Sequence, residues 1–103
     1  GLPNPGRFEK YMKLTGKDAD VAAYLQKEAE VEKFLSHVFG LIDQATDNYR
    51  SRNFTDLSVA FGCTGGQHRS VYCAELLAKH LRARHFHVEL HHRELEKKKE
   101  AAA

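Results

Sequence analysis

The fold is decided by residues 56–70, which read DLSVAFGCTGGQHRS. The short apolar run over 57–61 predicts a strand, and the glycine-rich residues after it predict a loop. A helical pattern then covers 70–83, with inward-facing positions at Val71, Ala74, Leu77, Ala78 and Leu81. A second strand is predicted over 86–90, where Phe86, Val88 and Leu90 alternate with polar residues. Strand, loop, helix and strand in this order form a βαβ unit with a right-handed crossover.

The fold class that follows is a single small α/β domain. Ser58, Ala60 and Gly62 give the first strand a second face of small residues, which favours a central strand covered on both faces. Upstream, apolar spacing predicts a short helix over 21–26 and a long one over 30–50. We therefore expect a mainly parallel sheet with helices on both faces. One domain over residues 1–103 is expected, with an N-terminal segment at 1–17 and a charged tail at 94–103.

Composition excludes several classes of protein. Hydrophobic residues make up 42% of the chain, which supports a real core, and the net charge of +2 excludes a globally basic protein. No apolar run approaches the ~20 residues that cross a bilayer, so no membrane partner is expected. The chain has two cysteines and no secretory signal pattern, which favours a reducing cytoplasm.

The histidines do not predict a metal centre. His85, His87 and His91 have the same parity along the second predicted strand. No cysteine or carboxylate completes a tetrahedral set with them in sequence. We expect neither a metal nor any other cofactor.

The loop has the composition of an oxyanion site. Its glycines let successive backbone N–H groups point into one concavity, and the following helix adds its unpaired first-turn N–H groups. Arg69 supplies a planar fork of donors that suits phosphate, and His68 adds charge when protonated. The candidate phosphate-binding residues are Cys63, Thr64, Gly65, Gly66, Gln67, His68, Arg69 and Ser70.

Two other interpretations of the loop remain open at this point. The bland one is a glycine turn that joins a strand to a helix. The sharper one is catalytic, because Cys63 and Arg69 have the Cys-x5-Arg spacing of phosphatases in which a thiolate attacks phosphorus. That chemistry also needs a group to protonate the leaving oxygen, and no acidic loop obviously supplies one. A non-catalytic binding domain is therefore favoured over an enzyme.

The run Gly62-Cys63-Thr64-Gly65-Gly66-Gln67-His68-Arg69-Ser70-Val71 closely resembles the signature of the RapZ family, the bacterial RNase adapter proteins. Leu2-Pro3-Asn4-Pro5 and Leu14-Thr15-Gly16 look like the first segment of that family's C-terminal domain. His92-Arg93-Glu94-Leu95-Glu96-Lys97 looks like its closing segment. The resemblance covers only this domain, so ATP hydrolysis by the family's N-terminal nucleotide-binding domain is not carried over.

The resemblance implies two binding activities. One is binding and sensing of a phosphosugar such as glucosamine-6-phosphate in the loop. The other is binding of a small regulatory RNA in an RNase adapter role, through the basic residues Arg93, Lys97, Lys98 and Lys99. Homo-oligomer formation and a nucleotide-binding domain in the full-length protein are expected on the same basis.

Overall fold

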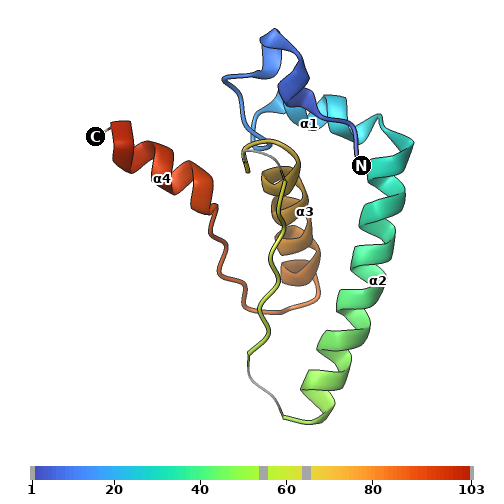
Figure 1. Ribbon diagram of the computed structural model, residues 1–103. Helices are drawn as coiled ribbons and strands as arrows, with labels where there is room; N and C mark the ends of the chain where they lie inside the picture. Colours follow the sequence, from blue (N-terminus) through green and yellow to red (C-terminus); the bar gives the residue numbers. More distant parts are fainter. Residues whose placement is uncertain (1, 54–55, 64–65, 103) are drawn as a thin grey trace.

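The domain is all-helical over the residues that the computed structural model describes, which are 2–53, 56–63 and 66–102. Two 3-10 turns, η1 (Pro5–Arg7) and η2 (Glu9–Tyr11), precede α1 (Ala19–Gln26) and the long α2 (Ala29–Ser51). After an extended stretch come α3 (Arg69–Ala83) and α4 (Arg93–Ala102). Figure 1 shows α2 and α3 as the two main helices, with the N-terminal turns and α1 above them and α4 to one side.

The helices form where apolar residues recur every three or four positions. The predicted helices over 21–26, 30–50 and 70–83 correspond to α1, α2 and α3, with ends that differ by one or two residues. Each of the three contributes side chains to one buried cluster: Val21, Leu25, Val31, Leu35, Tyr72 and Cys73. Burying this cluster is the main stabilising contribution, because apolar surface removed from water drives folding.

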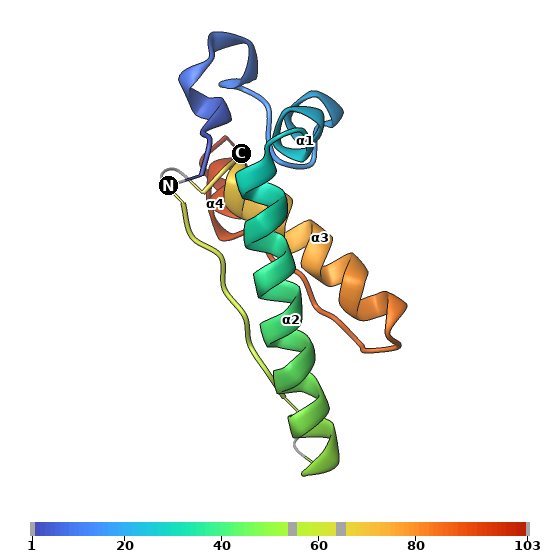
Figure 2. The same ribbon diagram turned by 90° about the vertical axis from the view of Figure 1, so that its right-hand side faces the viewer.

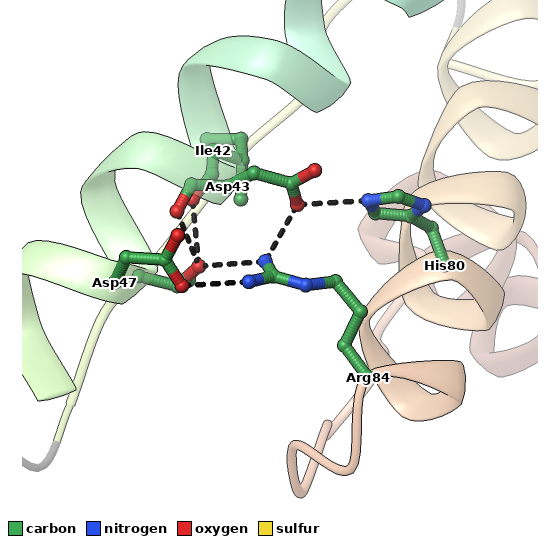
Figure 3. A network of polar contacts seen from close by, with 6 residues as sticks. Ile42, Asp43, Asp47, His80 and Arg84 are labelled. Carbon is green, nitrogen blue, oxygen red and sulfur yellow. Dashed lines mark hydrogen bonds and ion pairs between the residues drawn. The ribbon is translucent and has the colours of Figure 1, made fainter.

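The C-terminal halves of α2 and α3 are also joined by polar contacts (Figure 3). Asp43 accepts from Arg84 Nη1 at 2.7 Å and contacts His80 Nε2 at 2.8 Å. Arg84 Nη2 also donates to Asp47 Oδ1 at 2.6 Å. The ring of His80 stacks on Phe39, with centroids 4.4 Å apart and planes within 4°. These contacts fix the position of the last turns of α3 against α2.

The predicted α/β fold with a mainly parallel sheet and a βαβ unit is wrong: the described residues form no strand. The segments predicted as strands are extended: residues 56–63 return from the end of α2 to the start of α3, and residues 85–92 lead from the end of α3 to α4 (Figures 1 and 2). No backbone hydrogen bond joins residues 56–63 to residues 85–92 where the chain is described. A cavity of about 1000 Å³ lies between them, lined from both sides and from α3.

The predicted sheet does not form because the two extended segments, 56–63 and 85–92, do not pair with each other where the chain is described. A strand needs a neighbour about 4.8 Å away to accept and donate its backbone hydrogen bonds. The expected central strand over 57–61 is not covered on both faces, since Leu57 is 40% exposed and Val59 41%. The charged tail predicted at 94–103 lies almost wholly in α4, which begins at Arg93.

No described helix is both long enough and apolar enough to cross a membrane. Within the same residues, histidine, cysteine and carboxylate side chains form no group of three that could hold a metal ion.

Candidate functional site

The N-terminus of α3 begins where the glycine-rich loop ends. Gly66 has a φ of +60°, a conformation that side-chain-bearing residues rarely adopt, and its N–H donates to the Cys63 carbonyl at 3.2 Å. A Cβ at Gly66 would also lie 2.4 Å from Cγ of Glu94. The positive φ and the close approach of Glu94 together favour glycine at this position.

Cys63 and Ser70 face each other across the loop. The Cys63 Sγ lies 3.3 Å from the Ser70 hydroxyl and 3.4 Å from the Ser70 backbone nitrogen. Burial raises the thiol pKa, but it is outweighed by these two hydrogen bonds, a further one from the Gly66 backbone and the charge of Arg69, so the pKa of Cys63 falls below its ordinary value. The thiol is thus biased toward its thiolate form.

Cys73 behaves in the opposite way. It is buried in the core cluster, and burial together with the neighbouring Cys63 raises its pKa to about 11. Of the two free cysteines, only Cys63 combines partial exposure with a lowered pKa.

Gln67 and His68 are directed toward the N-terminal segment. The Gln67 amide donates to the carbonyls of Met12 at 2.7 Å and Leu14 at 2.6 Å. His68 is buried, and its Nε2 lies 2.7 Å from the Tyr11 carbonyl. The sequence groups both residues with the candidate phosphate ligands, whereas in the structure their side chains tie residues 11–14 to the start of α3.

Gly16 allows the backbone of the N-terminal segment to lie close to the backbone at the start of α3. Its N–H donates to the Gln67 carbonyl at 2.9 Å. A Cβ on Gly16 would lie 2.3 Å from the His68 carbonyl oxygen and 2.4 Å from the Tyr72 nitrogen. Backbone thus lies against backbone here, which leaves no room for any side chain.

Arg69 is the first residue of α3 and is partly buried. Its Nη1 donates to the Leu2 carbonyl at 3.1 Å. Its Nε is buried and has no hydrogen-bond partner within the part of the chain that the structure describes. A buried guanidinium N–H without an acceptor is costly, which makes this nitrogen a ready donor to an anion.

Three of the candidate loop residues line the large cavity: Cys63, Gly66 and Ser70. The opposite wall is formed by residues 85–94, which bring His85, His87, His91, His92 and Arg93 to the same space. Thr64 and Gly65 lie outside the described residues. The sequence analysis weighed His85, His87 and His91 as metal ligands and Arg93 as an RNA ligand, and it did not predict that they lie beside the loop.

The other candidate RNA-binding residues lie on α4, which contacts the loop. Lys98 donates to the Gln67 side-chain oxygen, and Lys97 lies 3.4 Å from Glu94. The adjoining extended segment is held to α3 by His92, whose Nε2 lies 2.8 Å from Glu75 Oε1. Lys98 therefore brings α4 into direct contact with the loop.

Comparison with known proteins shows the family of this chain. The family model described as RapZ C-terminal domain matches residues 1–96. The chain belongs to this family. The family expected from the resemblance is thus confirmed, and the match extends from the N-terminal segment through the loop to the start of α4.

Individual relatives are longer than this chain. A protein of Janthinobacterium sp. named nucleotide-binding protein is 46% identical over 95 residues, which are 92% of this chain and 33% of the relative. RNase adapter protein RapZ of Serratia proteamaculans is 42% identical over 99 residues, 96% of this chain and 35% of the relative. The protein of that name from Yersinia pseudotuberculosis gives the same figures. The chain thus spans about a third of the length of these RapZ relatives.

Proposed function

We propose that this domain binds the phosphate of a phosphorylated small molecule, such as a phosphosugar, at the N-terminus of α3. The observation that carries the proposal is that Ser70, in the first turn of α3, and Arg93, at the start of α4, line one cavity. The positive end of a helix dipole and an arginine on the facing wall together favour an anion. The cavity, at about 1000 Å³, has room for a sugar beside the phosphate.

Arg69 does not line the cavity, but it adjoins Ser70, which does, and its charge lowers the pKa of Cys63. Its buried Nε has no acceptor among the described residues, and a phosphate oxygen is the acceptor that an arginine fork fits best. Thr64 and Gly65 remain candidate ligands in the proposal, with Gly66 shaping the turn. His68 and Gln67 contribute by holding the N-terminal segment against α3.

The second part of the proposal is an RNase adapter role with RNA as partner. Relatives of more than 40% identity are named RNase adapter protein RapZ. Arg93, Lys97, Lys98 and Lys99 are the basic residues of α4, and they can neutralise RNA phosphates. In the full-length protein we expect a nucleotide-binding domain to accompany this one, in a cytoplasmic setting, with self-association into oligomers.

A cysteine-dependent phosphatase is the second candidate, and one observation favours it. The pKa of Cys63 is lowered beside Arg69, as a nucleophilic thiol requires. Glu89 and Glu94 line the same cavity and would be the carboxyl groups to test as proton donors. Hydrolysis of p-nitrophenyl phosphate that disappears in Cys63→Ser would establish this alternative, and binding without turnover would exclude it.

The decisive experiment follows the backbone amides by NMR during a titration with glucosamine-6-phosphate. Saturable shifts at Cys63, Gly66 and Ser70 are expected, with none for glucosamine at the same concentrations. Inorganic phosphate serves as a second probe and separates phosphate recognition from sugar recognition. Shifts that are equal for glucosamine, or absent from the start of α3, would contradict the proposed site.

A further inference from the structure

Three aromatic rings gather where the N-terminal turns cross α1. The centroids of Phe8 and Tyr11 are 6.1 Å apart, those of Phe8 and Tyr24 are 5.7 Å apart, and those of Tyr11 and Tyr24 are 5.4 Å apart. Both contacts of Phe8 are edge-type, with interplanar angles of 87° and 64°. We call this group of three rings the aromatic platform; Phe8 and Tyr11 belong to the N-terminal turns and Tyr24 to α1.

Phe8 is exposed and yet held in place. Its side chain is 44% exposed, although two rings touch it. Its N–H donates to the Pro5 carbonyl at 3.0 Å, and its carbonyl accepts from Tyr11 at 2.9 Å, since the residue ends η1 and begins η2. A large apolar ring that is fixed at the surface by its own backbone loses little freedom when it binds a partner.

The surroundings of the platform are cationic. Lys10 Nζ lies 4.9 Å from the centroid of the Tyr11 ring. Between η2 and α1 is a shallow cavity of about 390 Å³, lined by Lys10, Tyr11, Asp20, Ala23, Tyr24 and Lys27. Arg7 and Lys13 flank the rings in sequence, and Glu9 is the one acid within residues 5–13.

We propose that the aromatic platform binds unpaired bases of single-stranded RNA. A base stacks on the Phe8 ring, and Lys10 and Lys27 contact the flanking phosphates, an arrangement of ring and cation that recurs in sequence-tolerant single-strand binding. Duplex RNA does not fit, because its bases are stacked within the helix and cannot reach a protein ring. The inference rests on the RNA part of the proposed function and adds an RNA contact separate from the basic residues of α4.

The chain has no tryptophan, so a single one can be introduced as a reporter. Phe8→Trp places it on the platform. Met12→Trp, at a residue that is 57% exposed in the same segment, is the matched control. Each variant is titrated with a fluorescein-labelled single-stranded RNA and with a labelled duplex, and tryptophan emission and RNA anisotropy are recorded in the same samples.

The expected result is quenching of tryptophan emission in Phe8→Trp that saturates with the anisotropy of the single strand, with little quenching in Met12→Trp and none by the duplex. Phe8→Ala should weaken single-strand binding by roughly five- to 150-fold, as expected for one lost stacking contact. A rise in anisotropy without quenching in Phe8→Trp, or equal quenching by the duplex, would overturn the platform and leave RNA binding intact. No rise in anisotropy for the unmodified chain would overturn the RNA function itself and the platform with it.

Discussion

Arg84, which follows the last residue of α3, donates to Asp43 of α2 across a distance of 2.7 Å. The same carboxylate oxygen contacts His80 Nε2 at 2.8 Å, so Asp43 is the shared acceptor of two α3-side groups (Figure 3). Asp47 accepts a hydrogen bond only from Nη2 of Arg84. Its side chain is 64% exposed, whereas that of Asp43 is 33% exposed. The two aspartates therefore contribute unequally to the packing of α2 against α3, although both contact one arginine.

We expect Asp43→Ala to lower the thermal unfolding midpoint by roughly 5 °C, as for the loss of a partly buried, doubly bonded acceptor in a domain of this size. Asp47→Ala should lower it by less than about 2 °C, because exposed ion pairs contribute little. Differential scanning calorimetry of both variants in one buffer measures the difference. Equal shifts would show that Asp43 has no special role.

The contact between Gly16 and the start of α3 gives a second prediction. Gly16→Ala puts a Cβ within 2.4 Å of two backbone atoms, so α3 or the N-terminal segment must move. We expect a loss of at least about 2 kcal/mol in the free energy of unfolding, which urea titration measures.

Gly40→Ala is the matched control for Gly16→Ala. Gly40 lies within α2, and nothing lies within 4 Å of a Cβ built there. Alanine is the better helix former, so this variant should gain about 0.5–1 kcal/mol. A destabilisation at Gly16 no larger than the effect at Gly40 would refute the close approach.

The lowered pKa of Cys63 predicts selective alkylation. The thiolate is the reactive form, so the rate with iodoacetamide should fall as the pH is lowered through the pKa of Cys63, which lies below that of an ordinary cysteine. Cys73, buried and with a pKa raised to about 11, should stay unmodified near neutral pH. Peptide mapping by mass spectrometry separates the two sites.

Ser70→Ala tests the cause of the shift. The variant removes the hydroxyl that lies 3.3 Å from the Cys63 sulfur and leaves the backbone N–H in place. The pH profile of alkylation should move to higher pH. A profile that does not move would mean that the Ser70 side chain does not lower the pKa.

Local patterns were enough to locate α1, α2 and α3, because the apolar spacing that predicts a helix also buries it. Val21, Leu25, Val31 and Leu35 are all buried, as the spacing requires. The start of α3 after the glycines was predictable for the same local reason. In contrast, Leu41 is one of the apolar residues at helical spacing within the predicted long helix, and it is 65% exposed.

The sequence alone could not predict whether the extended segments pair into a sheet, or which distant residues contact the loop. Alternation over 86–90 indicates an extended chain, but a sheet depends on where the neighbouring segment lies. The partners of Gln67 and His68 lie more than fifty positions away at Tyr11, Met12 and Leu14, and no local signal points to them. The same holds for Arg93, whose approach to the cavity depends on the path of residues 85–92.

Arg69 is the residue on which the phosphate site can be tested most sharply. We expect Arg69→Ala to weaken glucosamine-6-phosphate binding by roughly 10- to 100-fold, as for the loss of a charge-assisted hydrogen bond. Arg69→Lys retains the positive charge but lacks the planar guanidinium. Its affinity for glucosamine-6-phosphate should lie between those of the unmodified chain and Arg69→Ala. Arg82→Ala removes an exposed arginine from the other end of α3, where it donates to the Val88 carbonyl, and should leave binding unchanged. Unchanged affinity in Arg69→Ala would remove this residue from the site.

The last prediction concerns the basic residues of α4 and the salt dependence of RNA binding. Each phosphate contact releases condensed counterions, so the slope of log affinity against log salt reports how many contacts are made. Replacing Lys97, Lys98 and Lys99 together by alanine should weaken binding at low salt and reduce the magnitude of the slope by about 2. Lys33→Ala combined with Lys79→Ala removes exposed charges from α2 and α3 and should leave the slope unaltered. Filter binding over a salt series measures both variants. If the triple variant kept the full slope, the RNA phosphates would have to lie on another surface, and α4 would serve only to hold the loop through Lys98 and Gln67.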